Sequence, residues 1–226
     1  MMEKKFRLEK YEEINEEIIS IDGYTDEYSI IQALKLNIDG QTKPSSMQFA
    51  RRATINEHSG SLRCSEAYIN TLQNGIVNAT KVSIGSSNGG DIYAQNIEIE
   101  NLNENTNIIC ANSLKITNLN SENTTITVDY KQIPILISKL ELIEEDIQHL
   151  EKKLSDAKQH NIPDISFLSK SIVRFKNEKK RIINSTQNTK IEIQNSTKET
   201  NKVVFILEDT TKTITIKKGN NIIISI

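Results

Sequence analysis

One short pattern of residues recurs between positions 62 and 128 of the 226-residue chain. An apolar residue is followed by a small residue two positions later and by apolar residues five and seven positions later, and the pattern returns after 15, 15 and 17 residues. Its four columns are Leu62, Val77, Ile92, Ile109 and Ile126; Cys64, Ala79, Ala94, Ala111 and Val128; Ala67, Val82, Ile97 and Leu114; and Ile69, Ile84, Ile99 and Ile116. Four columns that stay in register indicate a structural repeat.

The alternation within each repeat, together with the β-branched residues that fill it, predicts strands. Fifteen residues are too few for a strand, a crossover helix and a return strand, so successive strands can be parallel only if the chain coils. We therefore expect a mainly β protein built on a single-stranded parallel β-helix, or β-solenoid, over residues 48–132. Cys64 and Ala79 would occupy an inward bend, where larger side chains of neighbouring rungs would collide.

The segment before this ladder has a weaker pattern, and we expect residues 1–47 to form an irregular cap. Within it, residues 16–21 favour a strand, and residues 26–36 favour a short helix because Ile30, Ile31 and Leu34 share a helical face. The ladder would begin near Gln48, which fills the first column imperfectly. Such a cap would protect the end of the solenoid from pairing with another chain.

After Val128 the apolar spacing alternates between four and three residues, which predicts helices packed along a coiled-coil seam. A first helix would begin at Pro134 and break around His160, Asn161 and Pro163. Residues 133–186 are expected to form an antiparallel α-helical coiled-coil hairpin, and residues 187–226 an antiparallel set of short strands packing on or capping the β-helix. The seam residues are Leu136, Leu140, Ile143, Ile147, Leu150, Leu154 and Ala157, then Ile165, Leu168, Ile172, Phe175, Lys179 and Ile182.

The composition points to no charged partner, since the net charge is −2. No run approaches 18 apolar residues and the start lacks the apolar core of a signal peptide, so we expect a cytoplasmic protein without a transmembrane segment. Cys64 is assigned to the inward column and Cys110 to the outward phase, so the two thiols are expected to stay unpaired.

For each group of residues that could form a chemical site, a structural role is the better explanation. His58, His149 and His160 lack ligand spacing, and neither a metal nor a cofactor is expected. The segment 85–90 resembles a phosphate cradle, but no Lys-Ser or Lys-Thr and no helix follow it, so we interpret it as a solenoid corner. Arg51, Arg52 and Arg63 would form either a small anion site or a polar rim at the solenoid end, and the rim is favoured. No catalytic residues emerge.

A second corner is indicated by Asn101, Asn103 and Asn105, which align with Asn118, Asn120 and Glu122.

A basic cluster on the second helix is the candidate partner-binding surface. It comprises Lys176, Lys180 and Arg181, with Lys179 beside them. Nucleic-acid binding is not expected because Glu178 interrupts the cluster, and an ordinary charged helix face remains the simpler interpretation. A protein partner is the preferred hypothesis; the oligomeric state is left open.

The segment Gly90-Asp91-Ile92-Tyr93-Ala94, followed by Ile97 and Ile99 and by a change from strand to helix at Asp129-Tyr130, resembles the bacterial flagellar assembly protein A family. The order of ladder, hairpin and strands over residues 51–226 carries the resemblance. Members of that family are usually longer, with an N-terminal domain and more rungs. The resemblance implies that the β-helix is right-handed and that the protein is non-enzymatic, cytoplasmic and linked to flagellar assembly, placement or motility. It supplies no catalytic residues.

Three functions follow as hypotheses. The preferred one is a scaffold for flagellar or polar machinery, in which the hairpin engages a partner helix. The alternative is a self-assembling cytoskeletal β-helix protein of the bactofilin kind. An acyltransferase built on a left-handed solenoid is disfavoured, because the repeat is not made of hexapeptides and no histidine lies on a rung of the ladder.

Overall fold

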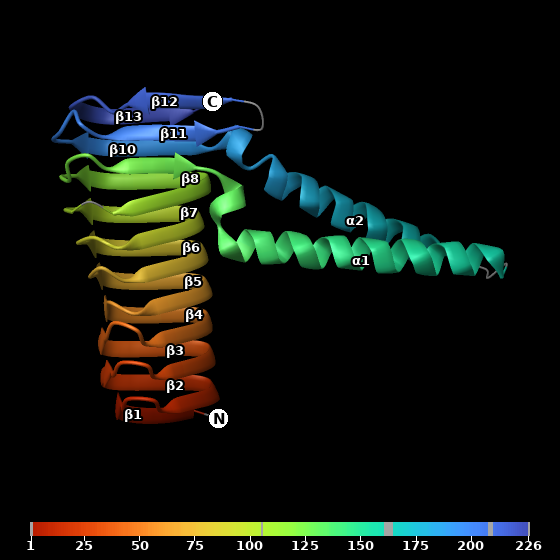
Figure 1. The fold of residues 1–226 in the computed structure, drawn as a ribbon, viewed down its shortest axis with the longest axis horizontal. Helices are drawn as coiled ribbons and strands as arrows, with labels where there is room; N and C mark the ends of the chain where they lie inside the picture. Colours follow the sequence, from red (N-terminus) through yellow and green to blue (C-terminus); the bar gives the residue numbers. More distant parts are fainter. Residues whose placement is uncertain (1, 105, 161–164, 208–209, 226) are drawn as a thin grey trace.

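A stack of coils forms the body of the protein, and two helices project sideways from it (Figure 1). The computed structural model describes residues 2–104, 106–160, 165–207 and 210–225. Eight successive strands build the stack. They are β1 (Met2–Leu8), β2 (Glu13–Thr25), β3 (Ile30–Thr42), β4 (Met47–His58), β5 (Ser61–Leu72), β6 (Ile76–Ser87), β7 (Asp91–Leu102) and β8 (Asn107–Leu119).

Each of these strands pairs in parallel with the next, which confirms a parallel β-solenoid of about seven turns. The register places Leu62 beside Val77 and Val77 beside Ile92, and it places Cys64, Ala79 and Ala94 in one stack. All of these side chains are buried, whereas residues between them face outward. The period-two pattern therefore records which side of each rung faces the core.

The ladder begins well before Gln48, so the predictions of a cap over 1–47 and a helix over 26–36 are wrong. Ile14 pairs with Ile31, and Ile31 pairs with Gln48, at intervals of 17 residues. Ile31 is buried while Leu34 is 56 % exposed, so these residues alternate as in a strand. The apparent helical face arose because Ile30, Ile31 and Leu34 also satisfy a helical spacing, and tertiary pairing decided between the two.

One part of the predicted ladder is out of register by one residue. Ile92 pairs with Ile108 and Ala94 pairs with Cys110, where the prediction had Ile109 and Ala111. Strand β8 carries an extra residue after Cys110, so the later pairs, such as Ile97 with Leu114, fall where expected. Cys110 is therefore inward and fully buried, contrary to its predicted outward phase. Ile109 and Ala111 point outward but are buried by the helices.

The corners are held by side chains that bond between rungs. Gly90 has φ 98°, and a Cβ there would lie 2.3 Å from the carbonyl oxygen of Gly75, so the corner requires glycine. The aligned asparagines form amide ladders, as their spacing suggested. Asn118 donates to Asn101 at 2.9 Å, and Asn120 donates to Asn103 at 3.2 Å. Asn105 lies outside the described residues.

The two helices interrupt a single coil. Strand β9 (Thr125–Val128) pairs over the first half of β8, and β10 (Lys190–Ser196) pairs over its second half. Between them the chain forms η1 (Tyr130–Gln132), α1 (Pro134–Gln159), α2 (Ser166–Ile183) and η2 (Thr186–Asn188). The predicted start at Pro134 is confirmed and His160 follows the last residue of α1, whereas Asn161 and Pro163 lie outside the described residues. We call α1 and α2 together the helical arm.

The C-terminal strands are only partly antiparallel, which corrects the predicted arrangement. β10 and β11 (Lys202–Ile206) continue the parallel coil over β8 and β9. Only β12 (Thr211–Thr215) and β13 (Gly219–Ser225) reverse direction, each pairing antiparallel with the strand below it. The solenoid thus ends in reversed strands, visible at the top of Figure 1.

Replacing Ala94 with Asp should destabilise the protein by roughly 3 kcal/mol or more, or prevent soluble folding. Ala94 is fully buried between Ala79 and Cys110, and a carboxylate there would have no polar partner. Urea unfolding measures the effect. Tyr68→Asp, at a position 52 % exposed on β5, is the matched control and should stay within about 1 kcal/mol of the parent. Equal losses in the two variants would contradict the assignment of inward and outward faces.

Candidate functional site: the helical arm

The base of the arm is packed against the outer face of the solenoid. Ile133, Leu136 and Ile182 form a second apolar cluster with Ile109 and Ala111 of β8. This contact explains why consecutive residues of β8 are all buried, since one face meets the core and the other meets the arm.

Polar contacts add to this apolar base. The backbone N–H of Ile135 donates to Asn78 Oδ1 at 3.3 Å, and the Arg63 guanidinium donates to Ser138 Oγ at 3.1 Å. Together with the apolar cluster, these contacts fix where α1 leaves the solenoid.

Beyond the base, the two helices pack on each other. Ile143, Ile147 and Ala157 of α1 and Ile172 of α2 are buried along the predicted seam. Ion pairs flank it on both sides: Lys139 Nζ lies 2.6 Å from Glu178 Oε1, and Lys176 Nζ lies 2.7 Å from Glu151 Oε1.

Lys179, which occupies a seam position, also pairs with a carboxylate of α1. Its ammonium contacts Glu144 and holds the pKa of that carboxyl below its usual range. The arm is therefore held together by apolar contacts along its seam and by ion pairs exposed at its edges, where each pair contributes little on its own.

The structure separates the residues predicted to bind a partner. Lys176, Lys179 and Lys180 line a recess of about 330 Å³ on one side of the arm, together with Ile147 and Ile183. Lys176 is paired with Glu151 and Lys179 with Glu144, so within the described part of the chain Lys180 is the cation of this recess that lacks a carboxylate partner. Arg181 lines a different recess of about 750 Å³ on the other side of α2.

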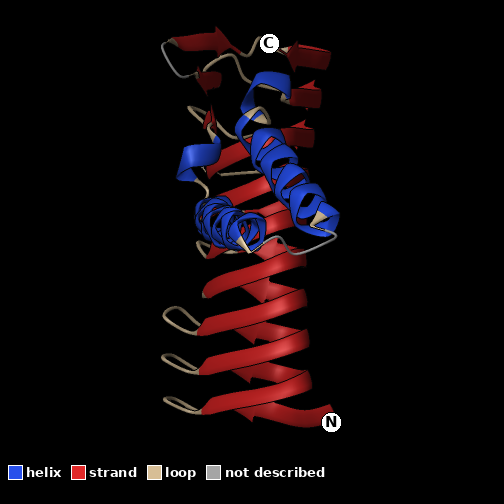
Figure 2. Ribbon diagram, turned by 90° about the vertical axis from the view of Figure 1, so that its right-hand side faces the viewer, coloured by secondary structure: helices blue, strands red, loops and turns tan. Residues whose placement is uncertain are grey.

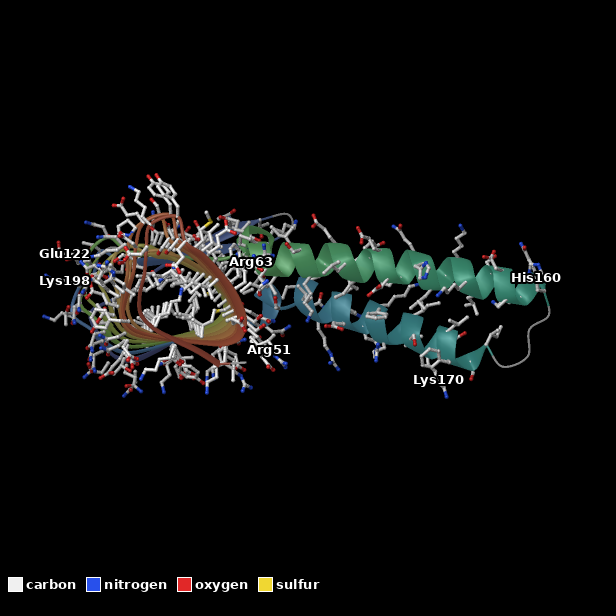
Figure 3. The ribbon with its side chains drawn as sticks, turned by 90° about the horizontal axis from the view of Figure 1, so that it is seen from below. Arg51, Arg63, Glu122, His160, Lys170 and Lys198 are labelled. Carbon is white, nitrogen blue, oxygen red and sulfur yellow. The ribbon has the colours of Figure 1, made fainter. Side chains whose placement is uncertain are left out.

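Two further cations of α2 that belong to this surface were not identified from the sequence. Lys170 and Arg174 line the 750 Å³ recess with Arg181, and no carboxylate of the described residues pairs with any of the three. Lys170 is labelled in Figure 3, where it points away from α1. The signal was present in the sequence, because positions 170, 174, 177 and 181 repeat the same four-and-three spacing as the apolar seam.

The other candidate sites do not assemble. Arg52 pairs with Glu66 at 2.9 Å and Arg63 bonds to Ser138, while Arg51 lies apart from Arg63 in Figure 3. The segment 85–90 is a corner followed by β7, as interpreted from its sequence. Among the described residues, no three His, Cys, Asp or Glu side chains gather in a way that could hold a metal ion.

Both cysteines are free and buried. Burial raises the pKa of each thiol, Cys64 and Cys110, to about 12. A thiol is nucleophilic as its thiolate, so these cysteines serve as small core residues.

His58 belongs to a buried polar network in the solenoid. Its Nδ1 lies 2.8 Å from Thr42 Oγ1, and its Nε2 lies 3.2 Å from the carbonyl oxygen of Ile76. Because Thr42 Oγ1 already accepts the N–H groups of Ser59 and Gly60, it donates to Nδ1, and Nε2–H donates to Ile76. Burial lowers the pKa of His58 to about 4, so the imidazole is neutral at pH 7.

Comparison of the chain with protein-family models, with curated proteins and with solved structures finds no significant match. Neither helix of the arm is long and apolar enough to cross a membrane, and the same holds for every helix in the described ranges. The resemblance to the flagellar assembly protein A family remains an expectation from the sequence.

The free energy of unfolding should fall as the pH drops from about 6.5 toward 4. The unfolded chain takes up a proton on His58 near pH 6.5, whereas the native state resists protonation until about pH 4. Stability is thus fully present above pH 6.5, and this group accounts for a loss of about 3 kcal/mol by pH 4.

Urea unfolding at several pH values, compared between the parent and His58→Gln, isolates this contribution from that of the carboxylates. The variant should show the shallower dependence. If it does not fold, NMR titration of His58 in the parent gives the pKa directly, and a value near 6.5 would contradict the prediction.

Proposed function

We propose that this protein is a non-enzymatic scaffold, in which the solenoid is a rigid support and the helical arm binds a partner protein. The supporting observation is the insertion of the arm within one coil, between β9 and β10. Both ends of the arm are tied to paired strands, and its 26-residue first helix extends about 40 Å at 1.5 Å per residue. Such an arm presents an exposed surface at a defined place on the solenoid.

In this proposal the arm is an antiparallel coiled coil and the partner contributes a helix. The recess lined by Ile147, Ile183 and Lys180 combines apolar side chains with one unpaired cation, because Lys176 and Lys179 of the same recess are paired with Glu151 and Glu144. This combination suits an amphipathic helix that carries an acidic residue beside its apolar face. Arg181 lies on the opposite side of α2 and is not part of this surface.

The resemblance to the flagellar assembly protein A family extends the proposal to biology. The order of ladder, arm and strands supports a cytoplasmic role in flagellar assembly, placement or motility. The alternative, a self-assembling β-helix of the bactofilin kind, requires end rungs that can stack on other copies. We place it second because the antiparallel β12 and β13 lie over the last parallel strands.

Removing the outer part of the arm should abolish partner binding and leave the solenoid folded. Residues 141–177 would be excised and Leu140 joined to Glu178 by a short Gly/Ser linker, which keeps Ile133, Leu136 and Ile182 on β8. The β signal in circular dichroism should persist, because the excised seam residues pack mainly on one another. Collapse of that signal would instead make the outer arm a part of the solenoid's core.

Deleting the gene should impair the assembly, number or placement of flagella. Complementation with Lys180→Glu should be weaker than with the parent, because the reversal places a negative charge in the proposed partner recess. Lys152→Glu, an exposed position on α1, is the control and should complement fully. Normal flagella and motility in the deletion strain would remove the flagellar part of the proposal. Full complementation by the shortened arm would move the partner surface onto the solenoid.

A further inference from the structure

The outer edge of α2 carries cations that form no ion pair with α1. Lys170, Arg174, Asn177 and Arg181 follow one another at intervals of four, three and four residues, and we call them the basic edge. At 100° per residue they fall within about 60° of one another on the helix. None of its three cations has a carboxylate partner among the described residues, whereas Lys139, Lys176 and Lys179 all pair across the seam.

An apolar side chain accompanies the basic edge. Val173 is 57 % exposed and lines the same recess as Lys170, Arg174 and Arg181. This face of α2 can therefore make an apolar contact through Val173 and ionic contacts through the cations beside it.

A trough with the complementary character lies on the first coils of the solenoid. It has a volume of about 720 Å³ and lies beside the start of α1. Its apolar lining includes Leu34, which is 56 % exposed, and Phe49, which is 39 % exposed. We call it the first-coil trough and define it by Glu16, Ala33, Leu34, Phe49, Ala50 and Ile135.

The trough continues a surface that already binds a helix. The outward column of the rungs runs through Phe49 and Arg63 to Asn78, Tyr93 and Ile109. At its upper end α1 covers this column, through the Ile135 contact with Asn78 and the apolar cluster at Ile109. Lower down, no helix lies beside strands β1 to β4 in Figure 1, and Phe49 of β4 lines the trough there.

The charges of the two surfaces are opposite. Residues 1–27 contain nine acidic and four basic side chains, and residues 166–183 contain six basic and one acidic. Two carboxylates, Glu16 and Glu17, line the trough itself. Arg63 is the cation that lines the trough, and it is engaged by Ser138 at the upper end.

Within one molecule the two surfaces belong to separate recesses that share no lining residue. The arm leaves the solenoid at the coil formed by β9 and β10, and the trough lies mainly on β2 to β5, toward the N-terminal end (Figure 1). Lys170 points away from α1 (Figure 3). A second copy of the chain supplies both surfaces at once.

We propose that two copies of this protein associate by docking the basic edge of one copy into the first-coil trough of the other. Val173 packs against Leu34 and Phe49, and the cations of the edge face Glu16 and Glu17. The contact joins two different surfaces, the basic edge of one copy and the trough of the other. A two-fold dimer would contain this contact twice, whereas an arrangement that does not close would build a chain of copies. It uses neither Lys180 nor the recess assigned to the partner protein, so the two proposals stand or fall separately.

Sedimentation velocity at low and high salt tests the proposal on the full-length protein. The parent should self-associate at low ionic strength, and the association should weaken as salt is added. Lys170→Glu with Arg174→Glu should raise the dissociation constant on the order of tenfold or more. Lys152→Glu with Lys153→Glu makes the same change in net charge on α1 and should leave the association unchanged.

A mixing experiment identifies the two surfaces. Glu16→Lys with Glu17→Lys, which reverses both carboxylates that line the trough, should abolish self-association in the same way as the reversal on α2. An equimolar mixture of the two variants should associate again, since one retains the native trough and the other retains the native basic edge.

Three results would overturn the proposal: a parent that stays monomeric at low salt, an α2 reversal that associates like the parent, or a mixture that remains monomeric although each variant shows native circular dichroism.

Discussion

Parallel pairing of each rung with the next is the constraint on which the rest of the molecule depends. The spacing between rungs is set by backbone hydrogen bonds at about 4.8 Å, so side chains in one column must stack on each other. Columns are therefore uniform where they face the core, as with Ile69, Ile84, Ile99 and Ile116. The number of residues in the corners is not constrained in this way. Equivalent residues are 14 positions apart between Gln48 and Leu62 but 18 apart between Ile108 and Ile126.

The columns explain how much of the fold was predictable. Between Leu62 and Ile99 the period is constant and every column is filled, so the inward residues could be assigned from the sequence. In two parts of the ladder the inward residues could not be assigned from the sequence. Ile108 and Ile109 are both apolar, as are Cys110 and Ala111, so spacing alone could not reveal the extra residue in β8. The longer coils of 17 residues at the N-terminal end were hidden because Glu16 and Gln48 interrupt their columns.

The candidate site was less accessible to sequence reasoning. The arm itself followed from the change of apolar period and from Pro134. The choice of Lys176, Lys180 and Arg181 rested on their nearness in the chain, and a helix distributes neighbouring residues around its axis. Only the ion pairs across the seam distinguish Lys176, which is engaged, from Lys170 and Arg174, which are not. Such distinctions require knowing how α1 and α2 lie against each other.

The insertion of the arm within a coil has a mechanical consequence. In Figure 2 both helices lie on the same side of the stack, and the strands on both sides of the insertion, β9 and β10, are paired over β8. A sideways force on the arm is therefore transmitted as a torque to two paired strands of one coil and not to a single flexible linker. Because both strands are hydrogen-bonded to the coil below, the solenoid resists the torque as a whole. The arm and the solenoid would therefore rotate together, so that movement of a partner bound to the arm would turn the entire protein.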